Sequence, residues 1–338
     1  MPLGSLGVEF FVIVAGVMML LGYERFKKDN SKKDERLLYP CRYAKKRFWR
    51  FFPYSTAAFV IAFCIIRIYR TISQGWEMNV HTILKWLSDD IWEIFLVKMT
   101  GLNNDNDFLN GPAWSLSAML IAEFFILVIL VRWEKHFATC IAPLMLMIGF
   151  GFWRHIPVAA HELWIGFATF GVLRVVLLYC IAYYCFIIIK KLQKIKFTST
   201  GKRLLTLAEG VCLCMTLVIM RYAESRNFRW CAILFVAIMI VIALSGSSHS
   251  MKIFHDSKYT RYLGKISFGI FLVHWPILKL FQYRNPNWTE TLLSVIIFFA
   301  VILLSAMIFV PCVEWIHRFF ARQFSHIKLC MIAETKNK

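Results

Sequence analysis

The sequence LLSVIIFFAVILLSAMIFV, residues 292–310, decides the fold class. It is an unbroken apolar stretch without a charged side chain, and a helix of this length crosses the roughly 30 Å hydrocarbon core of a bilayer. Inside hydrocarbon every backbone N–H and C=O must be paired within the protein, so the stretch must be a helix or part of a closed barrel. It lacks the polar–apolar alternation of barrel strands, which predicts a transmembrane helix.

Similar stretches recur along the whole chain of 338 residues. Of these residues 59% are hydrophobic and only 17% are charged, whereas soluble domains carry about 25% charged residues. We therefore expect an all-α, polytopic bundle of about nine transmembrane helices. The expected spans are Leu6–Tyr23, Phe51–Arg67, Trp114–Val131, Phe137–Phe152, Val172–Ile189, Leu204–Met220, Trp230–Leu244, Leu263–Phe281 and Leu292–Val310.

The net charge of +19 could attract a nucleic acid, but its distribution argues instead for a topology signal. With the N-terminus outside and the C-terminus inside, most lysine and arginine residues fall in inner loops, as the positive-inside rule requires. Membrane lipids with anionic headgroups are the expected partners of this charge, and no nucleic acid is expected. The inner loops are 24–50, 132–136, 190–203, 245–262 and the tail after 311.

We expect one membrane domain over residues 1–338. Its inner loop 24–50 is basic, its longest outer loop 71–113 is acidic, and its tail 312–338 is cytoplasmic. Within the outer loop, Ile83–Val97 places apolar residues at helical spacing, which predicts a short helix lying at the outer membrane surface.

Ionisable residues inside membrane spans are costly and are therefore candidate functional residues. Several spans carry polar groups towards their outer ends, which predicts one cavity that opens outward. The alternative is that the long basic side chains reach to the membrane interface, but Glu9 and His274 do so poorly. The predicted cavity residues are Glu9, Arg67, Trp114, Ser115, Ser117, Arg174, Ser267 and His274.

Arg47 and Arg50 lie three residues apart at the inner end of the second span, so a helix places them on one face. Two guanidinium groups can hold several phosphate oxygens through paired hydrogen bonds. The alternative, which the spacing alone favours, is a basic anchor for anionic lipid headgroups.

Acidic residues and cysteines add less. Asp89, Asp90 and Glu93 could act as paired carboxylates on one helix face, although a solvated face is the simpler interpretation. Most of the ten cysteines lie within or beside apolar spans, where small buried apolar side chains are expected rather than disulfides or metal ligands. No metal site is predicted.

Four segments resemble, in order, the signatures of the membrane acyltransferase 3 family. GVEFFVIVAG (7–16) resembles the signature that opens a span, and RFWRFFP (47–53) resembles the inner Arg-x-x-Arg motif. NGPAWSLSA (110–118) resembles the third signature, and LGKISFGIFLVHWP (263–276) resembles the late one. Together these segments extend the resemblance over residues 7–276.

This resemblance implies transfer of an acyl group, usually acetyl, from cytoplasmic acyl-CoA to a hydroxyl of a cell-surface or exported glycan. It implies about ten helices, an Arg47 and Arg50 pair that engages the acetyl-CoA donor, and no permanently bound cofactor. It also implies a multi-pass protein of the bacterial plasma (inner) membrane, with a glycan acceptor and polysaccharide-biosynthesis proteins as partners.

The sequence also departs from the family pattern. In family members the general base is proposed to be a histidine on a first helix, and this chain begins after that helix, which would leave nine helices of ten. Ala15 replaces the usual serine of the first signature. His274 matches a histidine common in the late motif, and it is a candidate base or a substrate-positioning residue. The catalytic residues are otherwise unassigned.

Two functions follow as expectations. The first is a membrane O-acyltransferase, acetyl being the expected group, that modifies an exported or cell-surface polysaccharide. The alternative is a non-catalytic or truncated family member that acts as a membrane partner in polysaccharide export.

Overall fold

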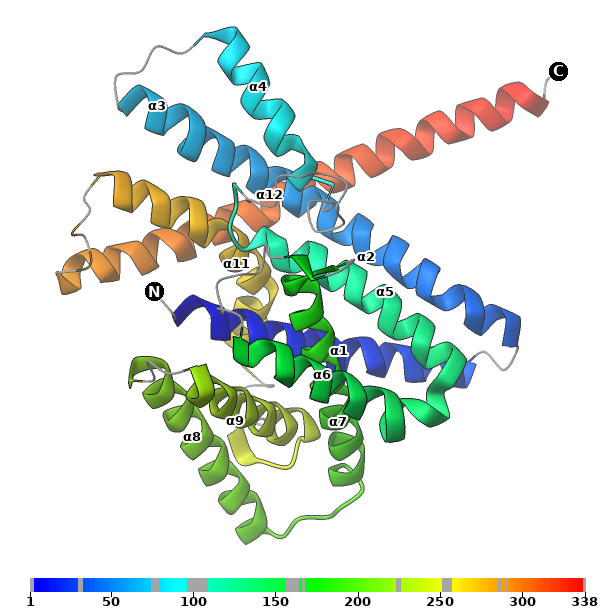
Figure 1. The fold of residues 1–338 in the computed structure, drawn as a ribbon. Coiled ribbons are helices and arrows are strands. Elements are labelled where there is room, and N and C mark those ends of the chain that lie inside the picture. Colours follow the sequence, from blue (N-terminus) through cyan, green and yellow to red (C-terminus); the bar gives the residue numbers. More distant parts are fainter. Residues whose placement is uncertain are drawn as a thin grey trace. The chain divides into compact units, whose positions relative to one another are not determined.

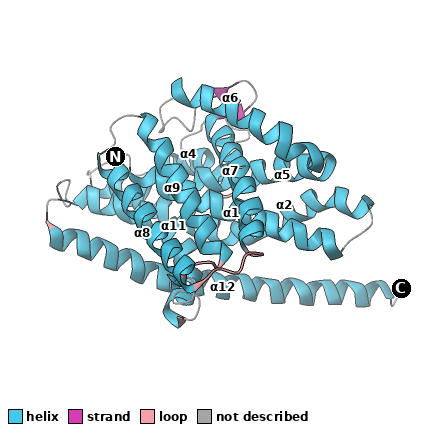
Figure 2. Ribbon diagram, turned by 90° about the horizontal axis from the view of Figure 1, so that it is seen from below, coloured by secondary structure: helices cyan, strands magenta, loops and turns pink. Residues whose placement is uncertain are grey.

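The protein is almost entirely helical in the computed structural model, which describes residues 3–29, 33–73, 79–95, 109–155, 164–165, 168–222, 226–250, 257–284, 287, 289 and 291–336 (Figure 1). The α-helices are α1 (Leu3–Asp29), α2 (Lys33–Ala62), α3 (Arg70–Ser73), α4 (Val80–Asp90), α5 (Ala113–His136), α6 (Ala142–His155), α7 (Phe170–Leu192), α8 (Ser199–Tyr222), α9 (Arg226–Ser245), α11 (Lys258–Arg284) and α12 (Leu292–Lys336). The other elements are the π-helices η1 (Phe63–Tyr69) and η4 (Phe137–Ile141), the 3-10 helix η2 (Ile91–Glu93), and two two-residue strands, β1 (Trp164–Ile165) and β2 (Ala168–Thr169) (Figure 2).

The expected class, an all-α polytopic membrane bundle, is confirmed. Within the described residues, six helical stretches are long and apolar enough to cross a membrane: Gly7–Asp29, Glu35–Tyr69, Ala113–Gly151, Phe170–Leu192, Lys258–Arg284 and Leu292–Phe319. The stretch Ala113–Gly151 covers two of the nine expected spans except for Phe152, and the two remaining expected spans lie in α8 and α9. The direction in which the helices cross the membrane stays a prediction.

The chain divides into two compact units, each with its own buried core. The first unit comprises Met1–Phe48, Val97–Asn106 and Trp114–Arg261, and the second comprises Trp49–Leu96, Asp107–Ala113 and Tyr262–Lys338. The boundary falls within α2, between Phe48 and Trp49. The single domain expected over residues 1–338 stays a prediction.

In the first unit, α1 and α7 lie side by side and run parallel. Glu9 pairs with Arg174 near their N-terminal ends, and Glu24 pairs with Lys190 at 2.6 Å near their C-terminal ends. Between them, Gly16 faces Ala182, because a Cβ built on Gly16 would lie only 2.7 Å from the Ala182 Cβ. Successive contacts are about two helical turns apart on both helices, so the register is constant over their length.

The chain reverses direction between α5 and α6. At Trp133 the backbone has φ −131° and ψ 39°, which breaks the helix geometry near the end of α5. Beyond this kink, the Tyr184 hydroxyl donates to the Ala138 carbonyl at 2.8 Å, and Gly149 packs against Leu177. The chain therefore runs along α6 in the direction opposite to α7. Because α5 runs in the same direction as α7, with Glu123 beside Tyr179 and Leu130 in the same pocket as Tyr183, α5 and α6 run in opposite directions, as the two expected spans require.

The second unit gathers α4, α11, α12 and the later part of α2. Its core includes Phe59, Ala62 and Leu109. Phe51 of α2 stacks on Phe268 of α11, with ring centroids 5.4 Å apart. Asn79 caps α4, because its side-chain oxygen accepts from the Thr82 N–H at 2.8 Å.

Two elements differ in extent from the expected ones. The surface helix expected at Ile83–Val97 begins earlier, as α4 at Val80, and passes into η2 at Ile91. The tail expected after residue 311 is helical as far as Lys336, because α12 continues through Pro311, and its cytoplasmic location stays a prediction. Sequence reasoning ended the span where charged residues begin, but a helix can continue into water once it has been nucleated.

Candidate functional site

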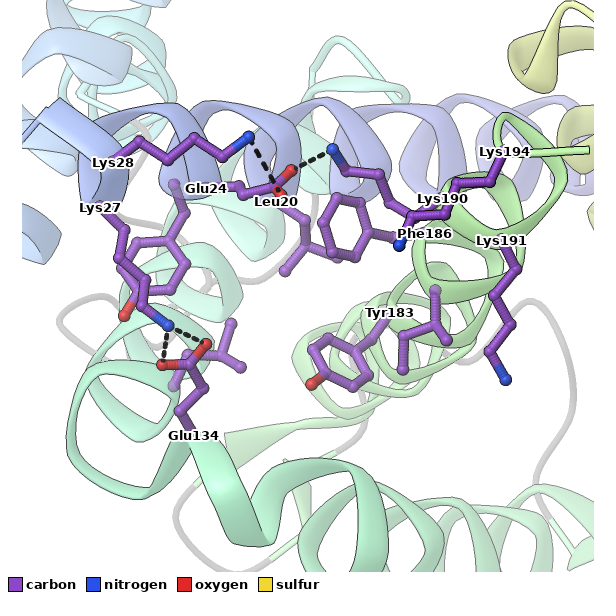
Figure 3. Close-up of a pocket in the computed structure, with 13 residues that line it drawn as sticks. Leu20, Glu24, Lys27, Lys28, Glu134, Tyr183, Phe186, Lys190, Lys191 and Lys194 are labelled. Carbon is purple, nitrogen blue, oxygen red and sulfur yellow. Dashed lines mark hydrogen bonds and ion pairs between the residues drawn. The ribbon is translucent and has the colours of Figure 1, made fainter.

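The C-terminal ends of α1, α5 and α7, together with residues just beyond α7, surround a pocket of about 550 Å³ in the first unit (Figure 3). We call it the lysine pocket, because five lysines line it: Lys27, Lys28, Lys190, Lys191 and Lys194. The remaining lining residues are Leu20, Tyr23, Glu24, Leu130, Glu134, Tyr183, Phe186 and Ile187. Three segments that the charge distribution predicts to be inner therefore meet at one place.

Some of these lysines form ion pairs with the two glutamates of the pocket. Lys27 Nζ lies 2.7 Å from both carboxylate oxygens of Glu134. Glu24 accepts from Lys190 at 2.6 Å and lies 3.7 Å from Lys28 (Figure 3). Five cations against two carboxylates leave the pocket positive, which favours a ligand with several negative charges.

Lys191 and Lys194 lie on the α7 side of the pocket. Both are exposed, and neither forms an ion pair with the residues that the structure describes. An ammonium group is a compact point charge that suits a phosphate oxygen. The aromatic rings of Tyr23, Tyr183 and Phe186 add flat apolar surface to the same pocket. The arrangement can hold a phosphate-bearing ligand with a planar ring.

A buried polar cluster lies deeper along α5 and α7 and includes a residue of α2. Arg47 of α2 forms an ion pair with Glu123 of α5, with Arg47 Nη2 and Glu123 Oε1 3.0 Å apart. The hydroxyl of Tyr179 in α7 donates to the same carboxylate oxygen at 2.8 Å. The other oxygen, Glu123 Oε2, is buried and has no hydrogen-bond partner among the described residues.

Sequence reasoning singled out Arg47 and missed Glu123 and Tyr179. The signal for Glu123 was present, since it is the one acid in the expected span Trp114–Val131 and intramembrane acids are costly. Tyr179 carried no such signal, because tyrosines are common in membrane helices. Arg50, the predicted companion of Arg47, is exposed and belongs to the second unit.

The predicted outer cavity is divided between the two units, so a single cavity stays a prediction. In the first unit Glu9 and Arg174 are both buried and form an ion pair with each other. Trp114, Ser115 and Ser117 are buried as well, and the Ser117 hydroxyl has no hydrogen-bond partner among the described residues.

In the second unit the predicted cavity residues are Arg67, Ser267 and His274. Arg67 Nε donates to Asp90 at 2.9 Å, and its guanidinium carbon lies 5.8 Å from the centre of the Trp86 ring. Ser267 is exposed and donates to the Gly264 carbonyl of its own helix at 2.8 Å. His274 is half-buried, and its Nδ1 lies 2.7 Å from the Phe271 carbonyl oxygen. If Nδ1 carries the proton that this contact needs, Nε2 is left as the basic nitrogen.

The segment that resembles the third family signature is anchored from two sides. The Glu93 carboxylate accepts from the backbone N–H groups of Leu109 at 2.8 Å and Asn110 at 3.0 Å. The Asn110 side chain donates to the Leu272 carbonyl at 3.0 Å, two residues before His274. Gly111 lies so close to Trp275 that a Cβ there would be 2.8 Å from a ring carbon.

The solvated face expected for Asp89, Asp90 and Glu93 is therefore wrong for two of the three. Asp90 and Glu93 are buried, and only Asp89 is exposed. A buried carboxylate needs a charged or N–H partner, and Arg67 and the backbone of residues 109–110 supply one to each. Both partners are distant in sequence, which hid them from a local pattern.

No group of three or more histidine, cysteine, aspartate or glutamate side chains that could hold a metal ion occurs among the described residues. The described cysteines are free thiols.

Comparison with known proteins gives one match. The model of the acyltransferase 3 family, described as an acyltransferase domain, matches residues 1–310. No curated protein and no solved structure matches the chain.

Proposed function

The chain belongs to the acyltransferase 3 family, and from this premise we propose that it is a membrane O-acyltransferase. It moves an acyl group, acetyl in the first instance, from acyl-CoA on the predicted cytoplasmic side to a hydroxyl of a cell-surface or exported glycan. It works in the plasma (inner) membrane of a bacterium, alongside polysaccharide-biosynthesis proteins.

The lysine pocket is the observation that carries the donor half of this proposal. Acyl-CoA carries phosphate groups and an adenine ring, and the pocket supplies cations and aromatic surface within one cavity. It is formed where segments predicted to be inner converge, which is the side on which acyl-CoA is made. Arg47 of α2, which pairs with Glu123 deeper along α5, is proposed to engage the donor as well, and Arg50 is proposed as its companion.

The reaction needs few parts. The acceptor oxygen attacks the thioester carbonyl carbon, the new C–O bond forms, the C–S bond breaks, and CoA leaves as a thiolate. A base takes the hydroxyl proton and returns it to the thiolate, while hydrogen-bond donors stabilise the oxyanion of the tetrahedral intermediate. His274 is the proposed candidate base within this chain, with its half-buried ring available through one nitrogen.

Transfer of radiolabelled acetyl from acetyl-CoA tests the function directly. Membranes containing the full chain are incubated with the polysaccharide of the source cell, and label in the glycan fraction is measured before and after mild base, which cleaves esters. We expect base-labile label well above that of membranes lacking the chain. Absence of label, combined with loss of polysaccharide export on gene deletion, would instead support the non-catalytic partner function.

The donor assignment has its own test. In the Arg47→Ala/Arg50→Ala variant the transfer rate at low acetyl-CoA should fall at least about tenfold, because charged hydrogen bonds to phosphate are lost. An unchanged rate would overturn the assignment of these arginines while leaving the transfer function standing.

A further inference from the structure

Glu123 is an ionisable residue in the buried part of a membrane helix, where a charged side chain costs free energy. Its side chain is 1% exposed, in a stretch of α5 with no other acid between Trp114 and Val131. Burying a carboxylate without partners costs several kcal/mol, so such a residue persists only with a counter-ion and a role. Arg47 and Tyr179 are its partners, and both reach the same oxygen.

Arg47 depends on Glu123 as much as Glu123 depends on Arg47. The Arg47 side chain is 15% exposed, too little for water to solvate a guanidinium. The Glu123 carboxylate therefore helps to fix both the position and the orientation of the Arg47 guanidinium. A guanidinium recognises phosphate or carbonyl oxygens through geometry as well as charge, so losing this support changes how it meets a ligand.

The cluster is connected to the lysine pocket through two helices. Tyr179 lies about one turn from Tyr183 on α7, and Glu123 lies about two turns from Leu130 on α5. Tyr183 and Leu130 both line the lysine pocket. All of these residues belong to the first unit, and the cluster lies next to the lysine pocket, nearer the middle of α5 and α7, without lining it.

We infer that Glu123 is a positioning residue of the donor site, which holds Arg47 in the orientation that engages acyl-CoA, with Tyr179 fixing the carboxylate. This inference rests on the proposed function for the identity of the ligand. It gives Glu123 a part in donor recognition although it does not itself touch the donor.

The KM and kcat of single variants distinguish a positioning role of Glu123 from a role in stability alone. Glu123→Ala should raise the KM for acetyl-CoA about tenfold or more while changing kcat much less, because a charged hydrogen bond is lost in donor binding. Glu123→Gln keeps an acceptor oxygen and the side-chain length, so it should recover most of the affinity. Tyr179→Phe should raise KM about threefold. Tyr184→Phe is the matched control, because it removes from the same helix a hydroxyl that donates to the Ala138 carbonyl, outside the cluster.

The double variant Arg47→Ala/Glu123→Ala sharpens the test. If Glu123 acts through Arg47, removing Glu123 has no further effect on KM once Arg47 is gone. The double variant should also unfold at a higher temperature than either single variant, because it removes both charges of the buried pair instead of one. Additive effects on KM would overturn the inference.

Equilibrium binding of labelled acetyl-CoA to the purified full chain keeps the two proposals apart. If the wild type binds but does not transfer, and Glu123→Ala weakens binding, the positioning role stands and the transfer function fails. If the wild type transfers and Glu123→Ala leaves KM and binding unchanged, the transfer function stands and the positioning role fails. If the wild type neither binds nor transfers, both are overturned.

Discussion

Buried charged side chains in the first unit are stabilised by partners of opposite charge. Glu9 and Arg174 are both almost fully buried, and each supplies the counter-ion of the other. Removing one partner leaves an uncompensated charge in a low-dielectric interior, which is far costlier than removing both.

The first prediction concerns this pair. Glu9→Ala should lower the free energy of unfolding by about 3–5 kcal/mol, because the buried Arg174 loses the carboxylate that balances its charge. The midpoint of thermal unfolding in detergent micelles measures the effect. Lys28→Gln, which removes an exposed and long ion pair with Glu24, is the control and should cost less than about 1 kcal/mol. Equal losses in the two variants would contradict the prediction.

At this scale the sequence identified which residues are unusual and could not identify their partners. Glu9, Arg67 and Arg174 stood out because charge inside an apolar span is improbable. Their partners come from helices distant in sequence, and a pairing over such a separation leaves no local pattern. For the same reason the local pattern predicts a solvated Asp90, although this residue is buried beside Arg67.

Helix pairs depend on small residues where backbones approach. Gly16 of α1 lies against the Tyr179 ring and Ala182 of α7, and a Cβ there would overlap both side chains. Close approach at small residues is the usual way in which membrane helices associate.

The second prediction follows from this contact. Gly16→Ala should destabilise the protein by about 1–3 kcal/mol, because the added methyl forces α1 and α7 apart. Gly7→Ala is the matched control on the same helix, since a Cβ there meets nothing within 4 Å. The control should be neutral or slightly stabilising, as alanine is a better helix former. Thermal unfolding compares the two, and a neutral Gly16→Ala would show that the helices do not meet there.

The third prediction concerns α4. Asp90→Asn should loosen this helix, because Arg67 loses the carboxylate that accepts two of its N–H groups. We expect faster hydrogen exchange of the α4 amides, by about tenfold or more if the bond contributes 1.5–3 kcal/mol. Asp89→Asn changes an exposed neighbour and should leave exchange unaltered. Identical exchange in both variants would argue that packing alone holds α4.

The existence of the helices could be predicted far better than their ends. Every expected span is helical, although Phe51–Arg67 runs from α2 into η1 and Phe137–Phe152 runs from η4 into α6, because hydrophobic length is a strong local signal. The ends of a helix depend on capping and on the neighbouring residues, so α12 exceeds the expected span and α4 begins before the expected surface helix. The kink at Trp133 falls in the expected inner loop 132–136, where the chain does reverse.

At the scale of the whole molecule, the lysine pocket lies where basic segments of the chain meet. Basic residues at the predicted inner ends of the spans indicate the topology, and five of them line one pocket. The sequence could not reveal this, because convergence of α1, α5 and α7 is a property of packing.

The fourth prediction tests the lysine pocket. Lys191→Gln/Lys194→Gln should weaken acetyl-CoA binding about tenfold and reduce its dependence on salt, because two cations facing the ligand are lost. Lys196→Gln/Lys202→Gln removes the same charge from nearby positions that do not line the pocket. Equilibrium binding at several salt concentrations compares the variants. Equal weakening in both would mean that net charge, and not the pocket, attracts the donor.

The long separation between the paired residues also bears on biosynthesis. Glu9 emerges from the ribosome 165 residues before Arg174, which at typical elongation rates is a delay of roughly 8–33 s. Throughout that interval the first helix carries a carboxylate whose counter-ion has not yet been made. Chains that stop before Arg174 never acquire this counter-ion, whereas completed chains gain it when α7 is made.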